Sequence, residues 1–447
     1  MELITKIVAA VNGLLWDKNL LLFLLCGTGI FYTIRLRFIQ VRKFGEGVRR
    51  LFSGFSMNGK AADESGMSPF QALTTAIAAQ VGTGNIAGAA TAIACGGPGA
   101  IFWMWVSAFL GMANIYAEAI LAQEYKTTIN GRVAGGPVYY IRTAFKGTFG
   151  KFLAGFFSVA IILALGFMGN MVQSNSIGAA FNNAFGLNRI LVGVIVAIIA
   201  AFIFLGGVKR IASVTEKVVP VMAVLYVIGC LIFLILNASA VPGAFRDIFV
   251  AAFSPQSIGG GLIGITVQKA MRYGVARGLF SNEAGMGSTP HAHAMAKVKK
   301  PQDQAVLAMI GVFIDTFIVL TMTALVIISS GVAATGANES TLAQDAFNQT
   351  FGSFGNIFIA ICLLFFAFST IIGWYFFGET NVKYLFGEKA VKIYAAIVIV
   401  FIVLGSALKV QLVWDLSDMF NGLMVIPNLL ALLVLNGTVA RIAKEDD

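Results

Sequence analysis

The chain has 447 residues, of which 58% are hydrophobic and only 12% are charged, about half the charged share of an ordinary soluble domain. This composition excludes a large soluble domain, because apolar stretches of about 20 residues, long enough to cross a bilayer, recur along the whole chain. The net charge of +10 does not indicate nucleic acid as a partner, because Lys and Arg lie mainly between the apolar stretches and form no basic face interleaved with aromatic residues.

The chain is therefore predicted to be an all-α integral membrane protein with eleven transmembrane helices. The predicted spans are 19–36, 68–93, 98–124, 152–180, 189–208, 216–237, 258–276, 304–330, 354–379, 390–408 and 415–437. Alternate connections contain 26 of the 31 Lys and Arg residues. The set assigned to the connection after the seventh span is Lys269, Arg272, Arg277, Lys297, Lys299 and Lys300. The positive-inside rule then predicts a multi-pass protein of the cell (inner) membrane, with the N-terminus outside and the C-terminus inside.

Two of these spans are predicted to be discontinuous. In the second, Gly82 and Gly84 stand among polar side chains in AQVGTGN, residues 79–85, which is a poor continuous helix. The seventh follows Gly259–Gly261 and runs through residues 264–274 with polar groups at mid-span, and its break is placed in residues 262–270. Because the seventh span comes five positions after the second, an odd offset, the two enter the membrane in opposite directions, as in inverted-repeat transporters.

This pattern divides the chain into two five-helix repeats with additions at both ends. Residues 1–66 would form an extra helix and a basic cytoplasmic loop, 67–240 the first repeat (spans 2–6), 241–440 the second repeat (spans 7–11), and 441–447 a cytoplasmic tail.

An interrupted helix at membrane depth leaves backbone groups unpaired, which costs several kcal/mol for each group unless something binds them. Free N–H groups attract a carboxylate and free carbonyls attract a cation, so a zwitterionic amino acid with sodium fits such a break. Close packing through small residues is the structural alternative. A nucleotide-binding loop is not favoured, because residues 82–88 do not match GxGxxG and no strand precedes them.

Residues 79–85 resemble the broken first core helix of the bacterial leucine transporter fold. Three further stretches resemble the alanine-or-glycine:cation symporter (sodium:alanine symporter) family: GGPGAIFWMWVSAFLG at 96–111, GGPVYYI at 135–141 and SNEAGMGS at 281–288. The resemblance spreads over some 200 residues and implies sodium-driven uptake of alanine or glycine.

The adjacent hydroxyls of Ser369 and Thr370 are candidate oxygen ligands for a hard cation, although in membrane helices such hydroxyls commonly bond to the preceding turn. The resemblance implies that the carbonyls of Ala78, Val81 and Phe366 complete this sodium site. A second sodium is predicted near Gln80, Asn85 and Thr266. No other metal is predicted, and no cofactor.

The substrate is predicted to bind where the two breaks face each other. The amides of Thr83 and Gly84 would take the carboxylate, the side chains of Asn170 and Gln268 would bond the charged ends, and Phe167, Met271 and Trp374 would leave room for little more than a methyl group. Ordinary packing and interhelical hydrogen bonding remain alternatives for these side chains. The complete predicted set is Gln80, Gly82, Thr83, Gly84, Phe167, Asn170, Thr266, Gln268, Met271 and Trp374.

Ionisable residues inside spans are costly and are functional candidates. Asp315 and Glu118 would each either carry a proton or pair with a basic neighbour such as Lys269 or Arg272. His291 and His293 are placed in a basic cytoplasmic loop and make a weak metal site without a third ligand. Glu283, beside Arg277, is read either as part of a cytoplasmic gate or as an exposed loop charge.

The favoured function is a secondary active transporter that carries a small neutral amino acid inward with sodium by alternating access. A proton-coupled symporter that uses Asp315 or Glu118 is the nearest alternative, and a passive channel is a weaker one. A membrane enzyme is not predicted, because both histidines lie in one loop and no nucleophile–base pair is evident. The predicted partners are the amino acid, sodium and the bilayer, with neither nucleic acid nor an obligatory protein partner.

Overall fold

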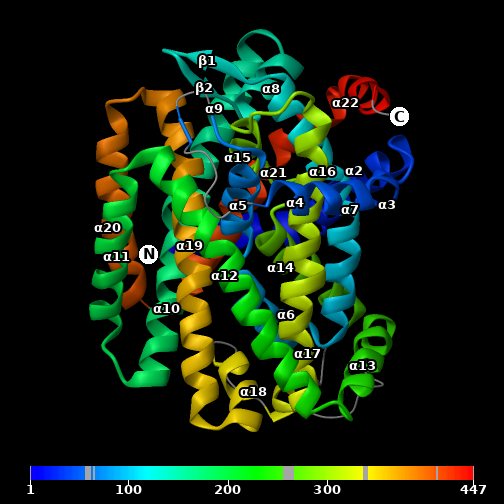
Figure 1. Ribbon diagram of the computed structural model, residues 1–447, viewed down its shortest axis with the longest axis vertical. Coiled ribbons are helices and arrows are strands. Elements are labelled where there is room, and N and C mark those ends of the chain that lie inside the picture. Colours follow the sequence, from blue (N-terminus) through cyan, green and yellow to red (C-terminus); the bar gives the residue numbers. More distant parts are fainter. Residues whose placement is uncertain are drawn as a thin grey trace.

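The structure is a computed structural model that describes residues 2–55, 62–63, 66–254, 266–335, 341–408 and 411–445. The described chain is almost entirely helical (Figure 1). Its strands are a short antiparallel hairpin, β1 (Thr127–Ile129) with β2 (Arg132–Ala134), at one end of the molecule. Residues 258–265 of the predicted seventh span, including Gly259–Gly261, lie outside the described residues.

The helices of the first half are α1 (Glu2–Asn12), η1 (Gly13–Asp17), α2 (Leu20–Arg35), α3 (Ile39–Arg42), α4 (Phe44–Gly54), α5 (Pro69–Gln80), η2 (Gly84–Gly88), α6 (Ala89–Gly96), α7 (Gly99–Glu124), α8 (Pro137–Ala144), α9 (Gly147–Ile161), η3 (Ile162–Gly169), α10 (Asn170–Phe185), α11 (Arg189–Phe204) and α12 (Gly207–Leu236). Those of the second half are α13 (Val241–Phe253), α14 (Val267–Asn282), α15 (Pro290–Ala294), α16 (Pro301–Val312), η5 (Phe313–Leu320), α17 (Thr321–Ser330), η6 (Val332–Thr335), α18 (Leu342–Phe351), α19 (Ser353–Phe386), α20 (Ala390–Ala407), α21 (Gln411–Val434) and α22 (Asn436–Lys444).

Within the described residues, eight helical stretches are long and apolar enough to cross a membrane. They are Glu2–Arg35, Gly99–Glu124, Gly147–Phe185, Gly207–Leu236, Pro301–Ser330, Ser353–Phe386, Ala390–Ala407 and Leu412–Val434. Each overlaps one predicted span, with ends that differ by a few residues in most cases. The fifth predicted span corresponds to the shorter apolar helix Arg189–Phe204, and the second and seventh correspond to the interrupted α5–α6 and to α14. The count of eleven spans stays a prediction.

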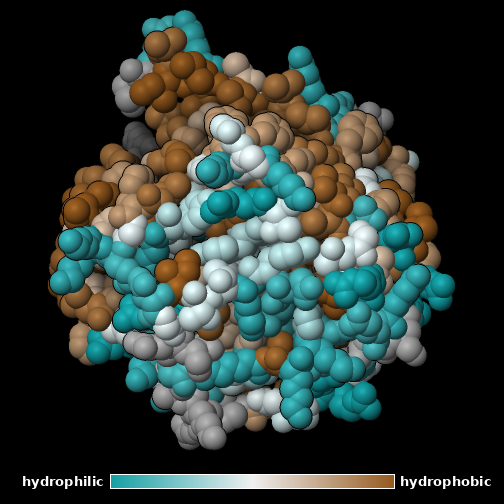
Figure 2. All heavy atoms as spheres, turned by 90° about the horizontal axis from the view of Figure 1, so that it is seen from above, coloured by the Kyte–Doolittle hydropathy of each residue, from teal (hydrophilic) through white to brown (hydrophobic). Residues whose placement is uncertain are grey.

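The outer surface matches a protein surrounded by lipid. Large apolar side chains are exposed on α11, α12 and α20, for example Phe202, Ile235 and Ile393 at 65%, 72% and 66%. Figure 2, which views the end with the β1–β2 hairpin, shows hydrophilic residues over the middle of that face and hydrophobic residues around much of its rim. An apolar belt with a polar end is the pattern that a bilayer imposes.

Small residues let the central helices approach closely, which sets the position of the site. A Cβ at Gly84 would lie 3.0 Å from Ser281 Cα, and one at Gly96 would lie 3.3 Å from Ala270 Cα. The η2–α6 segment and α14 therefore run antiparallel, with the end of α14 beside the start of η2. On the other side, a Cβ at Gly373 of α19 would lie 3.0 Å from Ala79 N in α5.

This arrangement corrects the charge assignment for the seventh span. Lys269, Arg272 and Arg277 lie within α14, not in the connection that follows it, because α14 runs on to Asn282. Arg272 forms an ion pair with Asp17 (2.5 Å). Arg277 forms a bidentate one with Asp418 of α21 (3.0 and 3.1 Å). The hydrophobic pattern could not locate this end, because the second half of α14 is rich in glycine and polar residues.

Candidate functional site

A helix interruption is present at the position predicted for the second span. α5 begins at a capping box in which Ser68 Oγ accepts from the Gln71 N–H and Gln71 Oε1 accepts from the Ser68 N–H, both at 3.1 Å. It ends at Gln80, and Val81 is extended, with ψ of 91°. Helical structure resumes at Gly84. We call Val81–Thr83 the first interruption.

Two amide N–H groups of the first interruption are bound by side chains. The Gly82 N–H donates to Asn85 Oδ1 (2.9 Å), and the Thr83 N–H donates to Gln173 Oε1 of α10 (3.1 Å). The Thr83 amide, predicted to take the substrate carboxylate, is thus held by Gln173. Gln173 was not among the predicted residues; its polar side chain in an apolar span, one turn beyond Asn170, was the available signal.

The five groups predicted to bind sodium lie together. Thr370 Oγ1 is 3.0 Å from the Ala78 carbonyl, 3.4 Å from that of Val81 and 3.1 Å from that of Phe366. Ser369 Oγ is 2.8 Å from the Phe366 carbonyl. The carbonyls at the end of α5 are free for this contact because a helix leaves its last C=O groups without intrahelical partners. The single hydroxyl proton of Thr370 can form a good hydrogen bond with only one of these three carbonyls, which leaves the other carbonyl oxygens poorly satisfied. This buried cluster of oxygens therefore suits a hard cation that prefers oxygen ligands.

Beside this cluster, buried polar atoms lack hydrogen-bond partners. They are Gln80 Oε1, Thr83 Oγ1, Asn170 Oδ1 and Gln173 Nε2, and all four residues are at most 2% exposed. An unpaired buried polar atom costs about 1–3 kcal/mol. The group comprises two amide oxygens that can only accept, an amide nitrogen that can donate and a hydroxyl that can do either. That combination suits a ligand carrying both an ammonium and a carboxylate.

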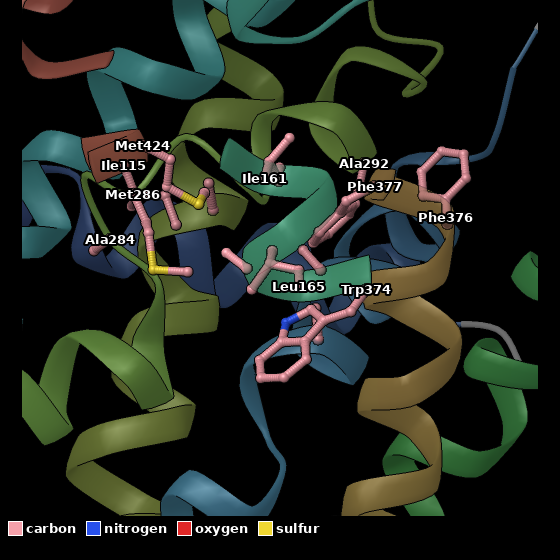
Figure 3. Close-up of a cluster of buried hydrophobic side chains, with 14 of the residues drawn as sticks. Ile115, Ile161, Leu165, Ala284, Met286, Ala292, Trp374, Phe376, Phe377 and Met424 are labelled. Carbon is pink, nitrogen blue, oxygen red and sulfur yellow. The ribbon is translucent and has the colours of Figure 1, made fainter. Parts of the chain in front are cut away.

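Other predicted substrate residues differ in their placement. Trp374 is buried, and a Cβ at Gly169 would lie 2.5 Å from its ring. Figure 3 shows it reaching from α19 toward the helix that carries Leu165. The Asn170 side-chain amide donates to the Gly166 carbonyl one turn earlier (3.1 Å). This donor therefore bonds within its own helical stretch and does not form an interhelical hydrogen bond. Phe167 packs on Tyr394 and Phe401 of α20, with ring centroids 5.8 and 4.9 Å apart, so packing accounts for it.

The structure does not bring Thr266, Gln268 or Met271 to the first interruption. Thr266 and Gln268 are exposed at the start of α14, where Thr266 Oγ1 caps the helix by accepting from the Lys269 N–H (3.2 Å). Met271 follows Ala270, which contacts Gly96 at the far end of α6. These predictions are wrong in position, because the second interruption lies at the other end of α14.

The observed second interruption is Glu283–Thr289, between α14 and α15. Gly285 and Gly287 have φ of +87° and +82°, which residues with a Cβ rarely adopt. The predicted break in residues 262–270 therefore does not hold for 267–270, which are helical, while 262–265 lie outside the described residues. The Gly285-Met-Gly287 triplet repeats the Gly82-Thr-Gly84 pattern of the first interruption, and that similarity was the signal.

A buried carboxylate holds the second interruption. Glu118 of α7 accepts from the N–H groups of Gly285 (3.0 Å) and Gly287 (2.8 Å) and from Asn428 Nδ2 of α21 (2.7 Å). Pairing of Glu118 with Lys269 or Arg272 is excluded, since its hydrogen-bond partners among the described residues are these neutral donors. Backbone amides that unwinding would leave unpaired in the membrane are thus bound by Glu118.

Asp315 connects the two interruptions. Its carboxylate accepts from Asn85 Nδ2 (2.6 Å), from Ser281 Oγ (3.0 Å) and from Thr316 Oγ1 (2.8 Å). No Lys, Arg or His among the described residues lies within 4 Å of it, so the predicted pairing with a basic neighbour does not hold for Asp315 either. A second sodium was predicted near Gln80, Asn85 and Thr266. At that position the structure places Asp315 and Ser281 close to Asn85, while Thr266 lies elsewhere, at the start of α14.

The residues after Asn282, predicted to be an exposed loop, are buried. Glu283 is fully buried, which excludes an exposed loop charge. His291 is buried and lies 2.7 Å from the Ser288 carbonyl through Nδ1 and 2.8 Å from Asn381 through Nε2. His293 is buried beside Gln304 at 3.0 Å. The sequence analysis placed these residues in a cytoplasmic loop because the lysine-rich stretch 297–300 follows closely.

Comparison with known proteins agrees with this architecture. The family model described as the sodium:alanine symporter family matches residues 1–446. The chain belongs to this family. It is 42% identical to the sodium/alanine symporter AgcS of Methanococcus maripaludis, over 97% of this chain and 95% of that protein. It is 43% identical to the probable sodium/glutamine symporter GlnT of Bacillus subtilis, over 99% and 91%.

Solved structures place this family member in the leucine-transporter type of fold, as the motif at residues 79–85 predicted. The crystal structure of MhsT in complex with L-phenylalanine aligns with a TM-score of 0.61, at 14% identity, over 86% of this chain and 99% of that one. The sequence identity is low, so this likeness concerns the fold alone. Together with its apolar helices, family membership establishes a multi-pass protein of the cell membrane.

Proposed function

We propose that this symporter-family chain carries a small neutral amino acid, alanine or glycine, into the cell together with sodium. The observation that carries the proposal is the oxygen cluster around Thr370, directly beside unpartnered donors and acceptors of the first interruption. A sodium ion would satisfy the oxygen cluster, and a zwitterionic amino acid would satisfy the unpartnered donors and acceptors. Trp374, close against Gly169, limits the side chain to about a methyl group.

The sodium ligands proposed are the carbonyls of Ala78, Val81 and Phe366 with the hydroxyls of Ser369 and Thr370. The substrate groups proposed are Gly82 and Thr83 of the first interruption, the adjacent Gly84, and Gln80, Asn170 and Trp374. Gln173 joins this set because it binds the Thr83 N–H. The substrate carboxylate would replace Gln173 Oε1 as the acceptor of the Thr83 N–H. The released Gln173 amide could then turn its Nε2 toward that carboxylate and donate to it.

Asp315 is the proposed second cation site. Its carboxylate and the Ser281 and Thr316 hydroxyls are hard oxygen donors, and the carboxylate bonds to residues that flank both interruptions, Asn85 and Ser281. Proton coupling is the alternative occupant, and here the geometry favours Asp315 over Glu118, because Glu118 is bound by two backbone amides and Asn428. A relative, YrbD of Bacillus subtilis, is named a putative sodium/proton-dependent alanine carrier protein, at 40% identity over 96% of this chain and 89% of that one.

The proposed orientation has the β1–β2 hairpin and α15 at the cytoplasmic end and α18 at the external end, with two inverted five-helix repeats. A cavity of about 1060 Å³ opens at the hairpin end, between α11, α19 and α20. Its wall includes Tyr375, next in sequence to Trp374. This supports release of substrate toward the hairpin end in an alternating-access cycle.

The energetics permit concentrative uptake. One charge that moves through 100 mV yields about 2.3 kcal/mol, and a tenfold sodium gradient adds about 1.4 kcal/mol. One sodium per substrate would therefore support roughly 500-fold accumulation.

The test is uptake of labelled alanine, glycine, glutamine and leucine into proteoliposomes. We expect alanine or glycine to accumulate only with an inward sodium gradient, and leucine to be excluded by the Trp374–Gly169 contact. Accumulation that persists when choline replaces sodium, but collapses with the pH gradient, would assign the coupling to protons. Asp315→Asn should then abolish it. Equilibration without accumulation under either gradient would indicate a passive channel.

A further inference from the structure

Glu283 opens the second interruption and is a buried carboxylate without a basic partner. It is fully buried, with φ of +57°. One carboxylate oxygen accepts from the indole N–H of Trp374, and the other accepts from Ser288 Oγ at 2.5 Å. No described Lys, Arg or His lies within 4 Å. A buried charge of this kind is costly unless a counter-charge or more donors reach it.

Glu283 has more unused accepting capacity than the other two buried carboxylates near the interruptions. An ionised carboxylate offers about four lone-pair sites. Glu118 accepts two backbone N–H groups and one amide, and Asp315 accepts one amide and two hydroxyls. Glu283 accepts only two donors, of which the Ser288 hydroxyl can rotate away.

The surroundings of Glu283 lead directly to the first interruption. Phe280, one turn before Glu283, contacts both sides: a Cβ at Gly84 would lie 3.3 Å from its ring, and its ring meets that of Trp374 edge to face, with centroids 5.6 Å apart. The opposite edge of Trp374 lies against Gly169, one helical turn from Gln173. Phe280 and Trp374 thus form one contiguous region of contacts between the first interruption and Glu283.

This region has opposite electrostatic character at its two ends. Near the first interruption, Gln173 Nε2 and the Thr83 hydroxyl are unpartnered and can donate. Of the two unpartnered acceptors, Asn170 Oδ1 belongs to the residue next to Gly169, which Trp374 contacts, and Gln80 Oε1 faces Gly311 of α16. At the Trp374 end, the carboxyl group of Glu283 has lone pairs to spare and carries negative charge when it is ionised. A carboxylate is therefore favoured at one end and an ammonium at the other.

We infer that Glu283 is the counter-charge for the substrate's α-ammonium and so restricts transport to amino acids. The inference rests on the proposed function, whose substrate it defines more narrowly: an α-amino acid, as opposed to a carboxylate of the same size. When the ammonium arrives it adds donors to Glu283, whose charge is then neutralised within the membrane. Trp374 and Ser288 are positioning residues that hold the carboxylate in place.

The test compares alanine with lactate, which has the same carboxylate and methyl group but a hydroxyl in place of the ammonium. Binding of both is measured in sodium to the full-length chain in detergent. We expect the wild type to prefer alanine strongly. In Glu283→Gln, alanine affinity should fall about 10- to 100-fold, since hydrogen bonds to a charged group are worth about 1.5–3 kcal/mol, while lactate affinity changes little.

A second variant separates recognition from structure. Trp374→Phe removes the donor to Glu283 but keeps an aromatic ring, so it should retain the preference for alanine over lactate, although affinity for both falls. Sodium-dependent thermal stabilisation of Glu283→Gln checks that the oxygen cluster at Thr370 is intact. The inference about Glu283 is overturned, with the proposed function left standing, by either of two results. One is an unchanged ratio of alanine to lactate affinity in Glu283→Gln, and the other is an equal loss of that ratio in Trp374→Phe. Failure of the wild type to bind alanine overturns the proposed function as well.

Discussion

The two interruptions look alike in sequence, Gly-Thr-Gly and Gly-Met-Gly, but are held in different ways. The first, Val81–Thr83, contains no ionisable residue, is bound by the amide side chains of Gln173 and Asn85, and has unpartnered polar atoms beside it. The second, Glu283–Thr289, is bound by the carboxylate of Glu118 through two of its backbone amides. The first has binding capacity left for a ligand, whereas the backbone of the second is fixed by Glu118 and its unused accepting capacity lies in the side chain of Glu283.

If the second interruption depends on Glu118, its removal should have the largest effect. Glu118→Ala leaves the Gly285 and Gly287 N–H groups and one of the two Asn428 Nδ2 N–H groups without an acceptor, which should cost at least about 3 kcal/mol of folding free energy at about 1–3 kcal/mol for each group. Thermal unfolding in detergent measures this. The control is Glu124→Gln at the end of the same helix, where Glu124 is 35% exposed and pairs with Arg441 at 3.4 Å. A similar loss in both variants would contradict the anchoring role.

The glycine geometry of the second interruption gives the next largest effect. Gly287→Ala combines a φ of +82° with a Cβ placed 2.8 Å from Phe157 and 2.9 Å from Asn428. Strain of about 1 kcal/mol and overpacking of about 1–3 kcal/mol should both appear as lost stability. Gly131→Ala is the matched control, since it has a φ of +79° and nothing within 4 Å. Equal melting temperatures for the two variants would remove the packing argument.

At the first interruption, substitutions should change ligand binding more than stability. Thr370→Val keeps the shape but removes the oxygen that meets three carbonyls, so the sodium concentration for half-maximal alanine uptake should rise by about tenfold, equivalent to about 1.4 kcal/mol. Thr380→Val on the same helix removes a hydroxyl that bonds only to the Phe376 carbonyl at 3.0 Å, and should change it less than about twofold. A sodium dependence unaltered by Thr370→Val would exclude this cluster as the sodium site.

The smallest effect concerns the size of the substrate pocket. A Cβ at Gly169 would meet Trp374 at 2.5 Å, so Gly169→Ala should push the indole toward the substrate and reduce alanine uptake relative to glycine by about fivefold. Gly155→Ala, with nothing within 4 Å, is the control and should leave the ratio unchanged. Should Gly169→Ala leave the alanine-to-glycine ratio intact, Trp374 does not set the size limit.

Parts of the site that lie close together in sequence could be predicted from sequence. Gly82 and Gly84 predict the first interruption because glycine weakens a helix locally. Ser369 and Thr370 were found as adjacent hydroxyls in an apolar span, although their pairing with α5 came from resemblance. Gln173 was missed in favour of Asn170 because both lie in the same polar stretch, and only the packing of α10 decides which one reaches Thr83.

Charged residues were assigned less well, because their surroundings come from distant parts of the chain. Glu283 and His291 precede a run of lysines, so they were expected in a loop, yet both are buried by α19 and its neighbours. Glu118 and Asp315 were expected either to carry a proton or to pair with a basic residue. Instead Glu118 binds backbone amides some 167 residues away, and Asp315 binds Asn85, 230 residues away.

By itself the sequence determined that this is a helical membrane protein, because the length of an apolar run sets whether it can cross a bilayer. It also determined where the chain first breaks its helix, since that depends on the glycines at the break. The tertiary structure alone decided where the second break falls and which donors reach Glu118, Asp315 and Glu283. Those partners are brought together by antiparallel packing of α14 against α6 and by parallel packing of α14 against α7, and no local pattern records such contacts.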